Sequence, residues 1–471
     1  MSKKISLAVA LAGMCALSLF PLSCGSSSSR PSGLLYVLTQ GTNGAGPDVS
    51  SFSIDLNSGN LSLINSNAST CPSSTTCGLP VSILLDPTGA TAFVMSQAAI
   101  TSYNVNSDGS LGSPTLAVPT ASAPLSGTPI AMTRDAAGQF LFVIAQGSDP
   151  SPTNCQTLPP SYPNIACASI SVFAMQPGST SLSAVAGSPF PVGRIPSALS
   201  VVNYTAPGTT AMEVLYVTFN SDPALHNDST LGAYSVDSSG SLTDLTSGTP
   251  YATATDPISV LAVNTYPAGE NTGGVFVYVG SQANQSGALS VFQVCPAGNA
   301  GCQANQLVPV GTPTSLGQNP VAMVVDPTNN FLYVVCYTSN QVYGYRINTT
   351  TGTLTGVSPA PNEPTGSQPV ALAMHPSVSD TGEFLYTSNS ASSNITGLTV
   401  STTSGSMSSP ITVIAPAAPS GMVARQGLWR QPSVPGPRRT ATVIIYGYPV
   451  YVGGYVDTTN PAEPAPQQPP A

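Results

Sequence analysis

Short apolar runs centred on an aromatic residue recur along this chain, separated by polar, glycine-rich and proline-rich stretches. The central aromatic residues are Tyr36, Phe93, Phe142, Tyr216, Tyr278, Tyr333 and Tyr386. Successive members are 57, 49, 74, 62, 55 and 53 residues apart. A repeat of about 50 residues is typical of propeller blades, and the two longest spacings indicate loop insertions.

A second apolar pattern follows each first run, with an aliphatic residue, an aromatic residue three positions later and an aliphatic residue two further on. It begins at Val49, Ile100, Ile170, Leu231, Leu289, Val342 and Ile395, where Leu398 replaces the ring in the last copy. Tight turns follow at Gly59, Gly109, Gly240, Gly352 and Gly405. Glycine permits the positive φ that short hairpins require, so each pattern predicts a strand leading into a hairpin.

A third kind of segment begins with proline and continues with apolar residues. Its copies start at Pro80, Pro129, Pro196, Pro257, Pro320 and Pro369. Proline at the first residue of a strand loses no ladder hydrogen bond, and a continuous apolar run suits a strand that is buried on both faces. The chain is therefore predicted to be all-β, a seven-bladed β-propeller of four-stranded antiparallel blades.

The first blade lacks an inner strand of its own, because the repeat begins at its second strand near residue 34. Residues 419–427 repeat the inner-strand pattern, so we expect residues 419–424 to pair with residues 34–38 and close the ring. The predicted domain order is a signal segment at 1–23, a Ser-rich tether at 24–33, the propeller at 34–427 and a Pro-rich tail at 428–471. For the tail, the sequence is compatible either with an extra hairpin or with a disordered segment.

The run from Gly317 through Asn319-Pro320 to Asp326 and Phe331, with Gly352-Thr-Leu354 downstream, resembles the lactonase-type seven-bladed propellers. That family includes the propeller-type 6-phosphogluconolactonases and related muconate cyclases. The resemblance covers roughly residues 34–424. It implies the same fold and a lactone hydrolase activity, although its motifs lie in strands and turns and identify no catalytic residue.

The amino-terminal residues are typical of an exported protein. Lys3 and Lys4 precede the apolar run ISLAVALAGMCALSLF, which is short for a membrane span and suits a signal peptide. The following PLSCGSSSS resembles a bacterial lipoprotein signal in which Cys24 is lipidated, except that Pro21 stands where leucine is usual. We therefore expect a lipid-anchored protein of the cell envelope, in the periplasm or on the outer surface. If Cys24 is not lipidated, the protein is secreted.

Cysteine spacing agrees with export. Three close pairs lie in loop-like sequence, Cys71 with Cys77, Cys155 with Cys167 and Cys295 with Cys302. None has the spacing of a zinc site and no histidine lies nearby, so local disulfides are predicted. Cys336 ends an apolar run and is expected to be a buried free thiol.

Charge restricts the class of partner. Before residue 425 the propeller segment contains seventeen acidic residues and three basic ones, Arg134, Arg194 and Arg346, for a net charge of about −14. Nucleic acid is a poor partner for such a surface, and so is a phosphate dianion. A small neutral ligand or a protein partner fits better, and the membrane is expected to be contacted only through the lipid anchor.

Loop length indicates which end of the propeller binds. Connections at one end are short turns such as 86–89, here called the short-turn face; those at the other end include 145–168 and 218–230, here called the long-loop face. Ligands of propellers bind where long loops surround the channel. Residues just before the inner-strand prolines should surround this opening, and they are Thr128, Ile195, Asp256, Asn319 and Gln368, with Arg194 beside Ile195.

Candidate chemistry is sparse. Arg194 and Asp256 belong to neighbouring blades, and together they could bind a ligand or simply form an ion pair that ties the blades. His375 is expected on the short-turn face with a structural role, while His226 lies with Asp222 and Asp228 in a solvated acidic loop. No metal site, cofactor motif or catalytic motif is recognised. The sequence therefore favours a ligand-binding or partner-binding propeller, with a lactone hydrolase acting on an uncharged substrate as the alternative.

Overall fold

A computed structural model gives the arrangement of the chain. It describes residues 33–41, 48–72, 77–118, 127–146, 168–192, 195–205, 210–220, 229–266, 272–283, 286–296, 301–375, 383–415 and 418–426. The chain divides into the units Met1–Arg30 and Pro31–Ala471, and every described residue lies in the second. The predicted signal peptide, Cys24, most of the tether and the 428–471 tail therefore lie outside the described residues. Gly33, predicted as the last residue of the tether, begins the first strand.

Seven antiparallel sheets make up the described fold, and no helix is present in this part of the chain. The innermost strands, in blade order, are β32 (Pro419–Gln426), β4 (Pro80–Leu85), β8 (Thr128–Arg134), β13 (Ile195–Tyr204), β18 (Pro257–Asn264), β23 (Pro320–Val325) and β28 (Pro369–His375). The second strands are β1 (Gly33–Thr39), β5 (Thr91–Ser96), β9 (Phe140–Gln146), β14 (Met212–Asn220), β19 (Val275–Ala283), β24 (Phe331–Cys336) and β29 (Glu383–Asn389). The predicted seven-bladed propeller is confirmed.

Third and outer strands complete each blade. The third strands are β2 (Asp48–Ile54), β6 (Ile100–Asn104), β10 (Ser169–Ala174), β15 (Thr230–Val236), β20 (Ser286–Val294), β25 (Gln341–Ile347) and β30 (Asn394–Val400). Blades 1, 2 and 7 have one outer strand each, namely β3 (Leu61–Ser69), β7 (Thr115–Leu116) and β31 (Met407–Ile414).

Blades 3 to 6 depart from the predicted four strands, because their outer strand is split into two short pieces that both pair with the third strand. The pieces are β11 (Ser183–Ala184) and β12 (Phe190–Pro191), β16 (Leu242–Asp244) and β17 (Tyr251–Ala252), β21 (Leu307–Pro309) and β22 (Thr314–Leu316), and β26 (Leu354–Gly356) and β27 (Asn362–Pro364). Positive-φ glycines lie between the pieces in blades 3 to 5, at Gly187, Gly248 and Gly311. Such residues turn the backbone out of the extended conformation and interrupt the ladder.

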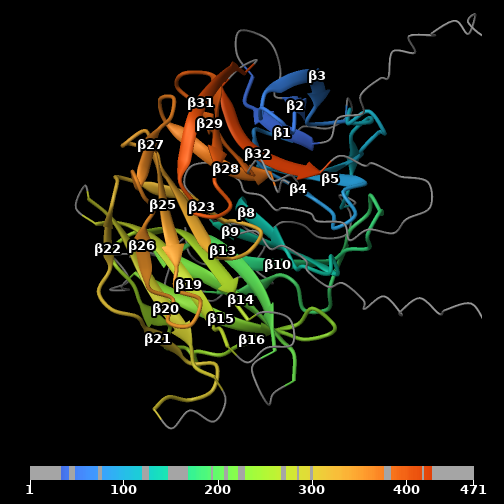
Figure 1. The fold of residues 1–471 in the computed structure, drawn as a ribbon. Coiled ribbons are helices and arrows are strands. Elements are labelled where there is room, and N and C mark those ends of the chain that lie inside the picture. Colours follow the sequence, from blue (N-terminus) through green and yellow to red (C-terminus); the bar gives the residue numbers. More distant parts are fainter. Residues whose placement is uncertain are drawn as a thin grey trace, which may run out of the picture. The chain divides into compact units, whose positions relative to one another are not determined.

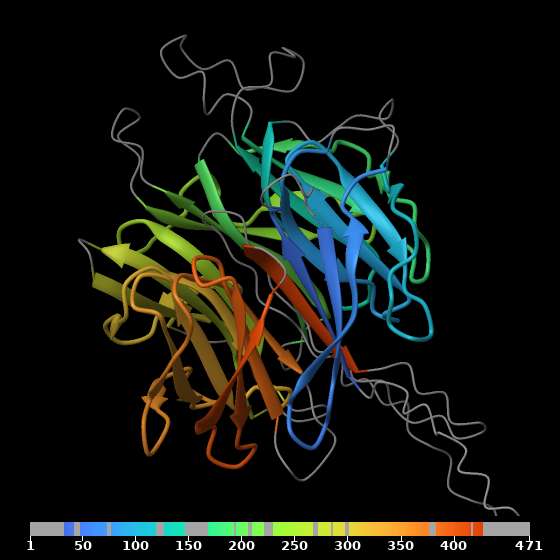
Figure 2. The ribbon, with the colours of Figure 1, turned by 90° about the horizontal axis from the view of Figure 1, so that it is seen from above.

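The carboxyl-terminal strand completes the first blade, as predicted. β32 pairs antiparallel with β1, which places Met422 opposite Val37 and Val423 opposite Tyr36. Figures 1 and 2 show this red strand beside the blue strands of blade 1. Each inner strand contacts the inner strand of the next blade, and β28 contacts β32, so the ring is closed. Closure removes the unpaired edge that an incomplete first blade would expose.

A hydrogen bond from a buried tyrosine to a glycine turn joins neighbouring blades. Tyr333 Oη donates to the Gly405 carbonyl at 2.8 Å, from blade 6 to blade 7, and Tyr386 Oη donates to the Gly59 carbonyl at 2.8 Å, from blade 7 to blade 1. Gly405 has φ 73°, and a Cβ there would overlap the Phe331 ring. Glycine is thus required both for the turn and for the close approach of the neighbouring blade.

The inner strands share a β-bulge next to the proline. In all seven blades the pairing register shifts across the residue that follows the proline, for example between Pro320 and Ala322. A bulge re-aims the neighbouring side chains. The positions before the prolines, from which the sequence predicted ligand contacts, are therefore set by the same irregularity in each blade.

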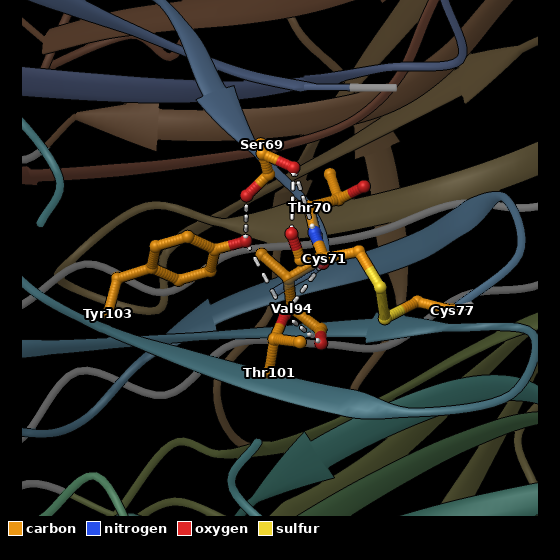
Figure 3. Close-up of a disulfide and its surroundings, with 7 residues drawn as sticks. All are labelled: Ser69, Thr70, Cys71, Cys77, Val94, Thr101 and Tyr103. Atoms are coloured by element: carbon orange, nitrogen blue, oxygen red, sulfur yellow. Dashed lines mark hydrogen bonds between the residues drawn. A yellow bond between two sulfur atoms is a disulfide. The ribbon is translucent and has the colours of Figure 1, made fainter. Parts of the chain in front are cut away.

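Two of the three predicted disulfides are confirmed. Cys71 bonds Cys77 with a Cα–Cα distance of 5.8 Å, and Cys295 bonds Cys302 with 6.1 Å. Figure 3 shows how the first is anchored, since Tyr103 Oη donates to the carbonyl of Ser69 and Thr101 Oγ1 to that of Thr70. These two hydrogen bonds fasten the end of β3, next to the disulfide, to blade 2. Cys155 and Cys167 lie outside the described residues.

We expect the unreduced protein to contain three disulfides and one thiol. Cys336 is fully buried, and burial raises the pKa of its thiol, so alkylating reagents should reach it only after denaturation. Peptide mapping by mass spectrometry should show links 71–77, 295–302 and, as predicted from the sequence, 155–167. Modification of Cys336 in the native protein would contradict its burial.

Substitution of Tyr386 by phenylalanine should weaken the closure between blades 7 and 1. The Gly59 carbonyl would lose its buried donor, which typically costs about 1–3 kcal/mol in the free energy of unfolding. The control is Tyr343→Phe, because Tyr343 Oη bonds Gln341 within its own partly exposed strand. Urea denaturation should show a much smaller loss for the control. Equal losses would mean that the contact between blades contributes nothing specific.

Candidate ligand-binding site on the long-loop face

Three residues on the long-loop face have an unusual backbone conformation. Asp256, Asn319 and Gln368 have φ values of 50°, 55° and 55°, and each directly precedes the proline that opens an inner strand. Side-chain-bearing residues rarely adopt positive φ, and the following proline restricts them further. Three equivalent positions in consecutive blades share this conformation, and strain of this kind concentrates at ligand-binding sites.

The backbone amides of these residues are held by side chains that come before them in the chain. Ser229 Oγ accepts the Asp256 N–H at 3.0 Å. Gln282 Oε1, from the second strand of blade 5, accepts the Asn319 N–H at 2.6 Å, and Asn340 Oδ1 of blade 6 accepts the Gln368 N–H at 2.7 Å. Each backbone amide therefore donates to an acceptor in the preceding blade. This hydrogen bond holds the left-handed residue on its amide side.

The backbone carbonyls of the same residues are held on the other side. The Asp256 carbonyl accepts the Gln282 N–H at 2.9 Å, the Asn319 carbonyl accepts the Tyr337 N–H at 2.8 Å, and the Gln368 carbonyl accepts the Ser390 N–H at 2.9 Å. These donors follow or end the second strand of the same blade. The amide and the carbonyl of each of these residues are thus both hydrogen-bonded. A ligand would therefore be contacted through their side chains.

The side chains at this face are polar and accessible. Asp256, Gln368 and Thr128 are exposed, while Asn319 is half-buried and donates from Nδ2 to Thr338 Oγ1 at 2.8 Å. The structure places Thr128 and Ile195 at the first residues of β8 and β13, at the same end of the blades. Carboxamide, hydroxyl and carboxylate groups can donate to and accept from sugar-type hydroxyls.

Arg194 lies outside the described residues, so its predicted pairing with Asp256 stays a prediction. Each of the three arginines that the structure describes lies toward the short-turn face. Arg134 Nε donates to the Leu85 carbonyl at 2.7 Å, and Arg346 donates to Thr403 and covers the Phe331 ring at 4.6 Å. Arg425 is buried in β32. The described long-loop face therefore presents no basic side chain to an anionic ligand.

His375 has the structural place that the sequence predicted. It ends β28 on the short-turn face, is fully buried, and its ring lies where a Cβ on Gly33 would be. Burial lowers the pKa of His375 to about 4, and the nearby Arg425 backbone opposes part of this shift. His226, Asp222 and Asp228 lie outside the described residues. Among the described residues, no three or more His, Cys, Asp or Glu side chains group as metal ligands.

Ser229, Gln282, Asn340 and Thr338 were not singled out by the sequence. Gln282 lies near the end of a second strand and accepts from the next blade, whereas Gln146, at the end of β9, donates from Nε2 to the Pro196 carbonyl of the next blade at 2.6 Å. A polar residue at the end of an apolar strand was the only signal that could have identified Gln146 and Gln282. Their partners lie 37 to 50 residues away, so local pattern does not indicate the contact.

Residues 228–374 match the family model described as lactonase, 7-bladed beta-propeller. This stretch runs from just before β15 to the last but one residue of β28, so it supports the lactonase resemblance over the third and outer strands of blade 4, all of blades 5 and 6, and the inner strand of blade 7. Among curated proteins, no sequence matches the chain significantly. Within the described residues, the structure has no helix that is long and apolar enough to cross a membrane.

Solved structures share the fold at low sequence identity. A putative 6-phosphogluconolactonase from Bacteroides fragilis is 13% identical, with a TM-score of 0.55 over 84% of this chain and 99% of that one. A periplasmic gluconolactonase from Pseudomonas aeruginosa is 16% identical, with a TM-score of 0.53 over 83% of this chain and 99% of that one. A protein from Lactobacillus plantarum is 12% identical, with a TM-score of 0.54 over 84% of this chain and 98% of that one. These likenesses show the propeller fold.

The buried histidine should make stability depend on pH. The folded protein holds His375 neutral down to about pH 4, whereas an unfolded histidine takes up a proton near pH 6.5. Unfolding therefore binds a proton between these values, and this contribution to stability is complete above pH 6.5 and is lost as the pH falls. Its size is about 1.4 kcal/mol per pH unit, up to roughly 3 kcal/mol.

His375→Gln removes this proton uptake, so it provides the comparison. We expect the difference in unfolding free energy between the parent and His375→Gln to shrink steadily from pH 7 to pH 4, measured by urea denaturation. Other groups titrate in both proteins and cancel in the difference. A difference that stays constant with pH would show that His375 titrates normally in the folded state.

Proposed function

We propose that this protein is an exported, lipid-anchored propeller that binds a small neutral ligand rich in hydroxyl groups at its long-loop face. Asp256, Asn319, Gln368 and Thr128 are the proposed contacts. The proposal is carried by the three left-handed residues before the prolines, whose backbone groups are bonded on both sides while their polar side chains stay accessible. Fixed polar groups of this kind can orient a ligand at small entropic cost.

A neutral ligand is favoured by the charges of this face. The described residues there include Asp256 and no basic side chain, and the chain as a whole carries a net charge of −9. A phosphorylated ligand would meet unfavourable electrostatics unless residues outside the described set supply cations. Carboxamides such as those of Asn319 and Gln368 offer both a donor and an acceptor, which matches a hydroxyl.

Lactone hydrolysis is the second candidate, favoured by the family match to residues 228–374. The Pseudomonas aeruginosa structure of similar fold is described as a periplasmic gluconolactonase. A hydrolase needs a group that activates water, and Asp256 is the one acid among the proposed contact residues. We propose Asp256 for that role if turnover occurs, with Arg194 as the group that would stabilise the oxyanion.

Glycine substitutions test the binding site without changing its backbone. Glycine adopts positive φ freely, so Asn319→Gly and Gln368→Gly remove only the carboxamide. Each should weaken binding of glucono-1,5-lactone or a neutral oligosaccharide by about five- to tenfold, as expected for one lost hydrogen bond. The measurement is isothermal titration calorimetry on the full chain.

The matched control is Asn329→Gly, because Asn329 also has positive φ, at 58°, but lies in the turn after β23 on the short-turn face. It should bind each ligand like the parent. If all three variants behave alike, the long-loop face is not the binding site. Binding lost in Asn319→Gly and Gln368→Gly alone would support the proposal.

Asp256→Asn and Arg194→Met distinguish hydrolysis from binding. In a hydrolase, pH-stat measurements on glucono-1,5-lactone should show turnover above the spontaneous rate, and Asp256→Asn should reduce it at least a hundredfold. In a binding protein no variant changes the spontaneous rate. For Arg194→Met, loss of stability with unchanged ligand binding would identify Arg194 as a tie between blades.

Export is tested separately. Cys24→Ser should move the protein from the membrane fraction to the soluble one and should abolish labelling by radioactive palmitate. Retention in the membrane fraction by this variant would contradict the lipid anchor.

A further inference from the structure

Three inner strands end in an aspartate on the short-turn face, and in two of them both carboxylate oxygens are occupied. Asp86 Oδ1 accepts the Thr91 N–H at 2.8 Å, and its Oδ2 accepts from Thr88 N–H, Thr88 Oγ1 and, from blade 3, Gly178 N–H at 2.9 Å. Asp326 repeats this arrangement, with Oδ1 bonded to the Phe331 N–H and Oδ2 to the N–H and hydroxyl of Thr328.

Asp135 of blade 3 is the exception. Its Oδ1 accepts the Phe140 N–H at 2.7 Å, as in the other two blades. Ala137 replaces the threonine that serves Oδ2 elsewhere, and no donor among the described residues takes its place. The residue is 1% exposed, so Oδ2 is buried without a partner. A buried carboxylate oxygen without a partner is costly, and native proteins rarely leave one unexplained.

The alternation of side chains along the strands directs both Asp135 and Glu213 toward the seam between blades 3 and 4. Arg134 reaches back to Leu85 of blade 2, so Asp135, the next residue, points toward blade 4. In blade 5, Tyr278 reaches forward to Gly352 of blade 6. Glu213 lies three residues before Tyr216, the counterpart of Tyr278, and therefore points back toward blade 3.

Glu213 has an unpartnered oxygen of its own. Its Oε1 is buried without a hydrogen bond, while the carboxylate interacts with the Asn203 side chain across the strand pair. Burial, followed by the negative charge of Asp135, raises the pKa of Glu213 to about 8. The charge of Asp135 therefore acts on Glu213, and each carboxylate has one buried oxygen that the described residues leave without a donor.

We propose that Asp135 Oδ2 and Glu213 Oε1 bind a hard divalent cation, with calcium as the best fit, across the seam between blades 3 and 4. Carboxylate oxygens are the ligands that calcium prefers, and its flexible coordination allows water to complete a site with two protein carboxylates. A site with so few protein ligands should be weak, with a Kd of about 10⁻⁴–10⁻³ M, as in extracellular calcium modules. The cation would tie blade 3 to blade 4.

The test is thermal unfolding of the full-length protein, stripped with EDTA and titrated with calcium chloride at constant ionic strength. The parent should show a saturable rise of several degrees in the unfolding midpoint, and calorimetry should show one calcium per chain. Glu213→Gln removes one ligand and should abolish both effects. Ala137→Thr gives Asp135 the hydroxyl that Thr88 gives Asp86, so it should raise the midpoint without calcium and abolish the calcium response.

The control is Thr88→Ala, which removes the hydroxyl that serves an oxygen of Asp86, because the next blade has Gln139 at the position that corresponds to Glu213. It should lower the midpoint and create no new calcium response. The proposal is overturned if calcium leaves the parent unchanged, or if the response persists in both Ala137→Thr and Glu213→Gln. A midpoint of the parent that depends on pH but not on calcium would show a shared proton in place of the cation, and would also overturn it.

Discussion

The ring of blades depends on one contact, between the aromatic second strand of a blade and the glycine turn of the next. Phe331 and Tyr333 both meet Gly405, the ring of Phe331 lying where a Cβ would be and the Tyr333 hydroxyl bonding the glycine carbonyl. Phe384 and Tyr386 meet Gly59 in the same way, which carries the contact across the closure of the ring. Glycine allows the positive φ of the turn and also leaves room for the aromatic ring of the neighbouring blade. The repeated aromatic strands and the repeated glycine turns in the sequence are therefore two sides of the same contact.

That repeated contact explains why the fold could be predicted. Each repeat puts the same kind of residue into the same environment, so Tyr333, Pro320 and Gly405 can be recognised from their counterparts elsewhere in the chain. The split outer strands could not be predicted in this way, because Gly248 and its equivalents have the same local pattern as any turn. The closing strand was predicted to pair over residues 419–424, and in the structure the pairing continues to Arg425, opposite Leu34, nearly 400 residues away.

The candidate site was predictable in position and not in conformation. Its residues were found because they precede the inner-strand prolines, yet the left-handed backbone of Asn319 depends on Gln282, which is 37 residues earlier and in the preceding blade. Likewise, comparing Asp135-Ala-Ala with Asp86-Pro-Thr shows in the sequence that Asp135 lacks the threonine. The sequence does not indicate that Glu213, in the next blade, interacts with Asp135. The partners of the site residues leave no periodic signal, because Ser229, Gln282 and Asn340 are different residues at different places in their blades.

The two ends of an inner strand meet different physical demands. At the long-loop face, β23 begins after Asn319, whose backbone is bonded and whose side chain is half-buried. At the short-turn face it is followed by Asp326, whose oxygens accept hydrogen bonds from the turn. Residues at the first end can change without disturbing the strand, so binding specificity can vary there. Residues at the second end cannot lose a partner without leaving a buried charge unsatisfied. Asp135 lacks such a partner for Oδ2, so burial raises the pKa of its carboxyl, and the positive charge of the neighbouring Arg134 opposes only part of that shift.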